Sequence, residues 1–175
     1  AYFQTNKLDR SAATYRRVLA STSLGPAADS ARLGLANTFE TMNDESSALK
    51  TLREAQLRHR SSATFTEARR NSHRLAESRG ERLTPFTEAE YRGLVRRLRN
   101  ASHYVGALEL LNEWTAQYPN SAVSDTRAME HVTTLYAQRT NVAAVGAAQQ
   151  FYETFPRSSL VGNVRLTDFR LAVRM

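Results

Sequence analysis

Two apolar runs with helical spacing, separated by a short turn, constrain the fold of this chain more than any other feature. The first run places an apolar side chain at every third or fourth position: Tyr91, Leu94, Val95 and Leu98. The second run has similar spacing: Val105, Leu108, Leu111, Trp114 and Tyr118, with Ala107 on its flank. Such spacing lines one face of an α-helix, and the turn at residues 100–103 is short. We therefore expect two antiparallel helices over residues 86–119, packed through their apolar faces and ended by Pro119.

This pattern recurs along the chain with a step of 37 residues. The step separates three pairs of matching positions: Ser11 and Ala48, Ala107 and Ala144, and Pro119 and Pro156. The copies of the first helix read Arg32-x2-Leu35-Ala36-x2-Phe39, Ala128-x2-His131-Val132-x2-Leu135 and Val164-x2-Thr167-Asp168-x2-Leu171. Turns are expected at residues 24–26 and 42–44, where Gly, Pro, Asn and Asp gather. The sequence thus predicts a repeat of helix pairs.

One segment and both ends depart from this regularity. Residues 61–85 interrupt the 37-residue step, and we expect a thinly apolar helix over residues 63–78 followed by a loop. Tyr2 is expected near the end of a separate first helix that precedes the helix around Ser11. We interpret residues 1–175 as one array of about four hairpins that starts and stops inside a repeat. Such a window implies a longer protein, or an oligomer or partner that covers the ends.

The central hairpin resembles a tetratricopeptide repeat, whose pattern is W-x2-L-G-x2-Y, then A-x3-F, then P. Here the pattern reads Tyr91-x2-Leu94-Val95-x2-Leu98, then Ala107-x3-Leu111, then Pro119. Trp114 stands where the family has alanine, and Val95 replaces a small residue, so the repeats are degenerate. The resemblance implies an all-α fold, in which antiparallel helix hairpins stack as a right-handed α-solenoid.

The resemblance also implies a function, that of a scaffold whose groove binds a partner protein or peptide. Polar positions on the first helices are the candidate contacts: Arg32, Asn37, Glu40, Arg92, Arg96, Arg99, Arg127 and Gln138. Because most of the charged candidates are arginine, we expect the partner segment to be acidic.

The charge of the chain leaves a second partner class open. The formal net charge is +7, and residues 53–99, with twelve Arg and six Glu, carry most of it. This excess predicts either a solvated helix face or a surface for an anionic partner. Nucleic acid is a less favoured partner, because the basic cluster Arg96-Arg97-x-Arg99 has no regularly spaced aromatic residues for stacking on bases.

No pattern of catalytic or metal-binding residues is found in the sequence. It has no glycine-rich phosphate loop, no G-x-S-x-G motif and no H-E-x-x-H pair, and its four histidines lack metal-ligand spacing. We therefore expect a protein that is not an enzyme and has no cofactor or metal. No run is apolar and long enough to span a membrane. The absence of cysteine fits both the cytoplasm and the periplasm.

An alternative interpretation places these residues in a larger bacterial cell-envelope protein. The segments Ala-Leu-Glu-Leu-Leu-Asn-Glu-Trp and Phe-Tyr-Glu-Thr-Phe-Pro-Arg-Ser are similar to helical arms of lytic transglycosylases and to outer-membrane assembly lipoproteins. That resemblance implies a non-catalytic superhelical arm.

Overall fold

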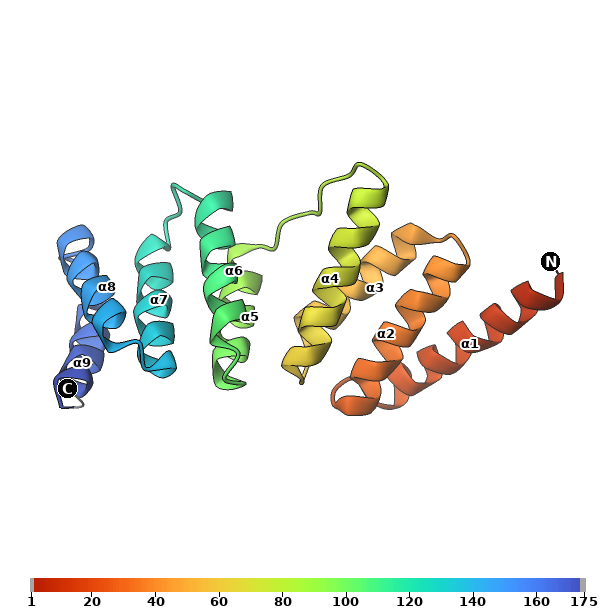
Figure 1. Ribbon diagram of the computed structural model, residues 1–175, viewed down its shortest axis with the longest axis horizontal. Coiled ribbons are helices and arrows are strands. Elements are labelled where there is room, and N and C mark those ends of the chain that lie inside the picture. The colour runs from red at the N-terminus through yellow and green to blue at the C-terminus, as the bar shows by residue number, and fades with distance from the viewer. Residues whose placement is uncertain (1, 174–175) are drawn as a thin grey trace. The chain divides into compact units, whose positions relative to one another are not determined.

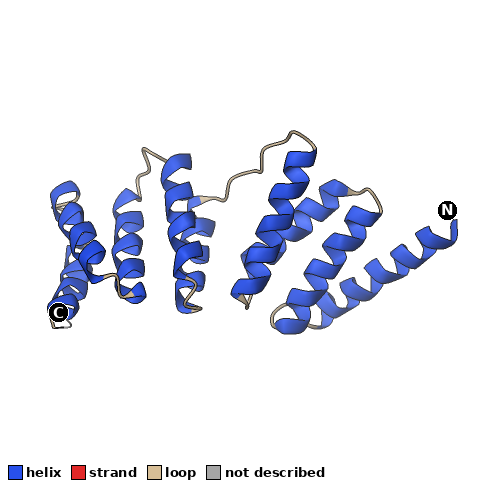
Figure 2. Cartoon of the chain, in the orientation of Figure 1, coloured by secondary structure: helices blue, strands red, loops and turns tan. Residues whose placement is uncertain are grey.

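The fold is all-helical, as the sequence predicts. The computed structural model describes residues 2–173, and within them helices are joined by turns and loops without any β-strand (Figure 2). The helices of this described part are α1 (Tyr2–Ser21), α2 (Pro26–Thr41), α3 (Glu45–Arg58), α4 (Ser62–Ser78), α5 (Glu88–Asn100), α6 (Tyr104–Gln117), α7 (Ser124–Gln138), α8 (Asn141–Thr154) and α9 (Val161–Ala172). They form two compact units, one ending at Thr84 and the other starting at Pro85.

The first unit packs each helix against the next one along the chain, from α1 to α4 (Figure 1). Two clusters of small and aliphatic side chains form its core, with Phe39 as the largest member: Ala12, Leu35, Phe39, Ala48 and Leu75 in one, and Ala36, Leu52, Ala55 and Ala68 in the other. The α4 helix also packs on α2, and an Arg74–Glu40 ion pair with a nitrogen–oxygen distance of 2.7 Å joins these two helices.

The second unit contains two antiparallel hairpins, α5–α6 and α7–α8, followed by α9 (Figure 1). The predicted apolar face of α5 is fully buried, and it packs against buried residues of α6: Ala107, Leu110, Leu111 and Trp114. In the second hairpin, Val132 of α7 packs with Ala148 and Phe151 of α8, and with Val164 of α9. Helices α5, α7 and α9 carry the first-helix pattern expected from the sequence, and α7 contacts both of the others.

The turn inside each hairpin has the same backbone feature. Each turn contains one residue with a positive φ angle. These residues are Asn43, Ser102 and Arg139, with φ values of 58°, 58° and 66°. In each case this left-handed residue is followed by a single residue and then by the next helix. Asn tolerates this conformation better than Ser or Arg do. The shared geometry explains why the three hairpins turn over the same short distance.

Two predictions made from periodicity were wrong. Tyr2 does not lie in a separate helix, because α1 runs without a break from Tyr2 to Ser21 and its first half contains no Gly or Pro to end it. Val105 does not lie on the buried face of α6, since it is 62% exposed. The inward stripe of α6 instead passes through Ala107 and Leu110, which are both fully buried.

The segment that interrupts the repeat step contains a regular helix and then an extended connection. The α4 helix buries Phe65, Ala68 and Leu75 along one side, close to the expected helix at 63–78. Its N-cap is Ser61, whose hydroxyl accepts a 3.1 Å hydrogen bond from the Ala63 amide. Residues 81–87 then have no helix, and α5 begins at the capping box formed by Thr87 and Glu90.

Candidate functional site

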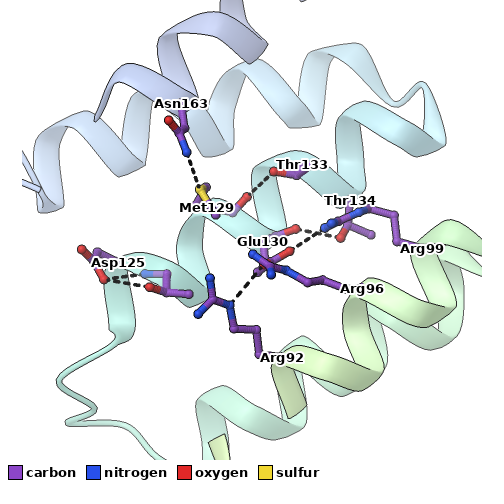
Figure 3. A network of polar contacts seen from close by, with 10 residues as sticks. Arg92, Arg96, Arg99, Asp125, Met129, Glu130, Thr133, Thr134 and Asn163 are labelled. Atoms are coloured by element: carbon purple, nitrogen blue, oxygen red, sulfur yellow. Dashed lines mark hydrogen bonds and ion pairs between the residues drawn. The ribbon is translucent and has the colours of Figure 1, made fainter. Parts of the chain in front are cut away.

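Three arginines of α5 converge on one buried glutamate of α7. Arg96 donates a 2.5 Å hydrogen bond from Nε to Oε1 of Glu130, and Arg99 donates one of 2.6 Å from Nη1 to Oε2. The Nε of Arg92 lies 3.7 Å from the same Oε1 atom. Figure 3 shows all three side chains reaching from α5 toward Glu130. We call these four residues the arginine cluster.

The sequence of α5 places these arginines together. Arg92, Arg96 and Arg99 are separated by four and three residues, so they follow one stripe of the helix, beside the buried stripe that includes Val95 and Leu98. On α7, the neighbouring residue Val132 anchors the helix in the core. Helix packing between α5 and α7 thus brings the arginine stripe to Glu130, whose side chain is only 1% exposed.

The cluster carries more positive charge than its single carboxylate can neutralise. Three guanidinium groups face one glutamate, which leaves a formal excess of two positive charges. Arg99 is mostly buried, but the side chains of Arg92 and Arg96 are each 45% exposed. Both of them face Glu130 through Nε, and these contacts with Glu130 do not use their terminal Nη atoms. The two Nη groups of a guanidinium can donate side by side to the oxygens of a carboxylate or a phosphate.

Two other predicted contact residues bind the backbone of their own unit. Arg127 of α7 donates a 2.8 Å hydrogen bond from Nη1 to the carbonyl of Tyr118. Arg32 of α2 donates from Nη2 to the carbonyl of Ser23, and its Nη1 lies 3.7 Å from a carboxylate oxygen of Asp29. Arg32 is only 3% exposed. Arg127 therefore fastens the start of α7 to the end of α6, and Arg32 fastens α2 to the loop that follows α1.

The remaining predicted contacts lie apart from the arginine cluster. Asn37 and Glu40 belong to α2 of the first unit, where Asn37 is exposed and Glu40 pairs with Arg74. The hydrogen bond from Arg74 lowers the pKa of Glu40. Gln138 is half-buried and lies two turns after Glu130, at the end of α7. Of the predicted residues, the structure thus brings Arg92, Arg96 and Arg99 together around a common partner.

Acidic residues at the starts of α5 and α7 serve the packing of the second unit. Glu88 accepts hydrogen bonds from the Ser121 hydroxyl and from Nε1 of the buried Trp114, the latter at 2.8 Å. These hydrogen bonds lower the pKa of Glu88, and the one from Ser121 has the larger effect. Asp125 accepts the equivalent bond from Ser158 at 2.6 Å. Both carboxylates therefore accept a hydrogen bond from a serine hydroxyl in the loop that precedes the next odd-numbered helix.

Apart from the arginine cluster, a groove lies between α6, α7 and α8. It has a volume of about 330 Å³, with Leu111 and Phe151 among its apolar walls and Asn112 and Gln150 among its polar ones. His131 of α7 also lines it, and burial lowers the pKa of this imidazole, which favours the neutral form. His131 is half-buried at the edge of this groove.

Two properties of the described residues and three comparisons complete the description of the site. Within residues 2–173, no group of three or more acidic, His or Cys side chains is placed to hold a metal ion. None of the helices described there is both long and apolar enough to cross a membrane. No protein-family model, curated protein or solved structure matches this chain. We therefore infer the role of the arginine cluster from its own contacts and charges.

Sequence reasoning missed the residue that organises the cluster. Glu130 was not among the predicted contacts, because a polar residue on a first helix gives no indication of burial by itself. One signal in the sequence was the spacing of 34 residues between Arg96 and Glu130. Glu40 and Arg74 are separated by the same number of residues. This separation pairs an acid with an arginine between α2 and α4 in the first unit, and between α5 and α7 in the second.

Proposed function

We propose that this protein is a non-enzymatic binding scaffold that receives an acidic segment of a partner protein or peptide on the exposed face of α5 and α7. We further propose that its hairpins stack as a right-handed solenoid of the tetratricopeptide-repeat kind. The repeated 37-residue step and the shared hairpin turns support this stacking. In such arrays, the first helices line the surface that partners contact.

The observation that carries the proposal is the unbalanced charge of the arginine cluster. A structural ion pair needs one arginine for Glu130, and two are already within 2.6 Å of it. Arg92 adds a further cation at 3.7 Å, although its repulsion by Arg96 opposes folding. A ligand carboxylate between the exposed ends of Arg92 and Arg96 would relieve that repulsion. The surface is therefore better balanced with an anion bound than without one.

Magnitudes favour a peptide with several contacts over a single bound ion. An ion pair at an exposed site contributes about 0.2–1 kcal/mol, so one carboxylate gives only weak affinity. Neighbouring acidic residues add contacts and raise the rate of association. Nucleic acid is a poorer match, because its affinity depends on many phosphate contacts at once. The cluster offers two well-exposed guanidinium groups, which suits a short acidic segment.

Fluorescence anisotropy with a defined probe tests this proposal. The probe is a labelled peptide that contains a run of glutamates, and its twin has glutamine at the same positions. We expect the wild-type protein to bind the glutamate peptide, and the double variant Arg92→Gln/Arg96→Gln to bind it at least ten times more weakly. The matched control is Arg157→Gln/Arg170→Gln, which removes the same charge from exposed positions outside the cluster.

Three outcomes would oppose the proposal. Equal affinity for both peptides would show that the protein does not recognise the negative charge of the peptide. An equal loss of peptide affinity in the two double variants would show that binding depends on the net charge of the protein and not on a specific site. Tighter binding of single-stranded DNA than of the glutamate peptide, lost steeply with salt, would favour nucleic acid as the partner.

A further inference from the structure

The presence of Glu130 in an anion-binding surface calls for an explanation. A glutamate among three arginines reduces their attraction for an acidic ligand, and its burial costs solvation free energy. A surface selected only for positive charge would be stronger without it. The carboxylate also accepts hydrogen bonds, which can fix where its arginine partners lie.

The contacts of Glu130 show what it contributes. Its Oε1 atom faces the Nε of both Arg96 and Arg92, at 2.5 and 3.7 Å, and its Oε2 atom accepts from Arg99. Arginine side chains on a helix surface otherwise sample many rotamers. The hydrogen bond at Nε fixes the plane of the Arg96 guanidinium group, whereas Arg92 is held beside it by the attraction between opposite charges. Figure 3 shows the side chain of Arg92 extending from α5 toward Glu130.

We propose that Glu130 is a positioning residue, which pre-organises Arg92 and Arg96 as a paired receptor for a carboxylate group of the ligand. This inference rests on the proposed function. We further infer that the site prefers a carboxylate group to a polyanion that binds through charge alone. Arginine side chains that are already held in place lose less conformational entropy when they form paired hydrogen bonds with a carboxylate.

The test separates geometry from charge with the variant Glu130→Gln. This change raises the net charge by one and removes the anchor. If Glu130 positions the arginines, binding of the glutamate peptide weakens about five- to tenfold, as expected for loss of preorganised charged contacts, whereas binding of heparin becomes tighter. Glu109→Gln and Glu153→Gln are matched controls on exposed positions of α6 and α8, and they should not weaken peptide binding.

A second variant keeps the test valid if Glu130→Gln is poorly folded. Glu130→Asp conserves the charge and shortens the side chain by one methylene group. The positioning role predicts weaker peptide binding without a change in heparin binding. A role limited to charge balance predicts that neither ligand is affected. Circular dichroism of each variant shows whether α5 and α7 remain helical.

A measurement without any peptide distinguishes failure of this inference from failure of the proposed function. The NMR signal of the Arg96 Nε–H group should be shifted and slow to exchange in the wild type, and should move toward that of free arginine in Glu130→Gln. The wild type could bind glutarate but not the peptide, and Glu130→Gln could lose the binding of glutarate. That result would support the role of Glu130 and refute the proposed function. Binding of neither ligand would refute both. Peptide binding by a folded Glu130→Gln variant that equals or exceeds the wild type would refute the positioning role alone.

Discussion

The Ser158 hydroxyl donates a 2.6 Å hydrogen bond to the Asp125 carboxylate, which connects the loop before α9 to the start of α7. The same connection occurs one repeat earlier, between Ser121 and Glu88. Each serine follows a Pro-x step after an aromatic residue at the end of a second helix. This contact therefore fixes how successive first helices are spaced in the second unit.

Removing one of these hydroxyls should destabilise the unit measurably. Ser158→Ala leaves the half-buried Asp125 carboxylate without one donor, and we expect a loss of about 1–2 kcal/mol in the free energy of unfolding. Urea denaturation followed by circular dichroism gives this value. The control is Ser159→Ala at the adjacent exposed position, which should change stability by less than about 0.5 kcal/mol. Equal effects of the two substitutions would show that the hydrogen bond does not matter.

Trp114 should be the most sensitive position of the α5–α6 hairpin. It is fully buried, stacks on Tyr91 with ring centroids 6.1 Å apart, and donates from Nε1 to Glu88. Trp114→Ala should cost about 3–5 kcal/mol, because it removes a large buried side chain and leaves a cavity. Trp114→Phe retains an aromatic ring and should cost less, mainly through the lost hydrogen bond.

The measurement for Trp114 is urea denaturation followed by circular dichroism, since the chain has a single tryptophan and both variants lose its fluorescence. A loss below about 1 kcal/mol in Trp114→Ala would contradict the packing described for this hairpin.

Two helical glycines should respond to alanine in opposite directions. A Cβ atom added to Gly106 would lie 2.6 Å from Nδ1 of His103, the atom that caps α6 by accepting from the Gly106 amide. Gly106→Ala should therefore displace the cap and cost about 1 kcal/mol. Gly93 of α5 has open space around the same position, so Gly93→Ala should stabilise the protein by about 0.5–1 kcal/mol. Thermal unfolding of the two variants checks the signs, and stabilisation by both would contradict the cap geometry.

The stability of the protein should fall between about pH 7 and pH 5, partly through His131. Burial lowers the pKa of this imidazole in the folded state. The unfolded chain therefore binds a proton at a higher pH, so unfolding takes up a proton and is favoured as the pH decreases through this range. His131→Gln should reduce the slope of unfolding free energy against pH. An unchanged slope would show that His131 titrates alike in both states.

Much of the fold could be predicted from the sequence, because helix boundaries coincide with strong local signals. Gly25 with Pro26, and Pro119, mark ends or starts of helices that the structure confirms. Periodicity also identified the buried face of α5 correctly. Periodicity failed for Val105, which is exposed. Apolar residues in α6 extend beyond one face of the helix, and spacing alone does not show which of them point into the core.

The candidate site was harder to predict than the helices. The α5 arginines could be assigned to one stripe by spacing alone, yet their common partner lies on another helix. Burial of Glu130 depends on how α7 packs against α5, which local patterns do not specify. For the same reason, Arg32 and Arg127 were grouped with the surface arginines, although both donate to backbone carbonyls.

Mapping of the bound glutamate peptide by NMR tests the central claim most directly. Backbone amide shifts of the isotope-labelled protein are recorded while the unlabelled peptide is added, and the glutamine twin is the control. The account predicts that the largest shifts occur around Arg92 and Arg96 on α5 and around Glu130 on α7, and that the twin causes almost none. Largest shifts in the groove at Asn112 and Gln150, or in the first unit, would contradict it.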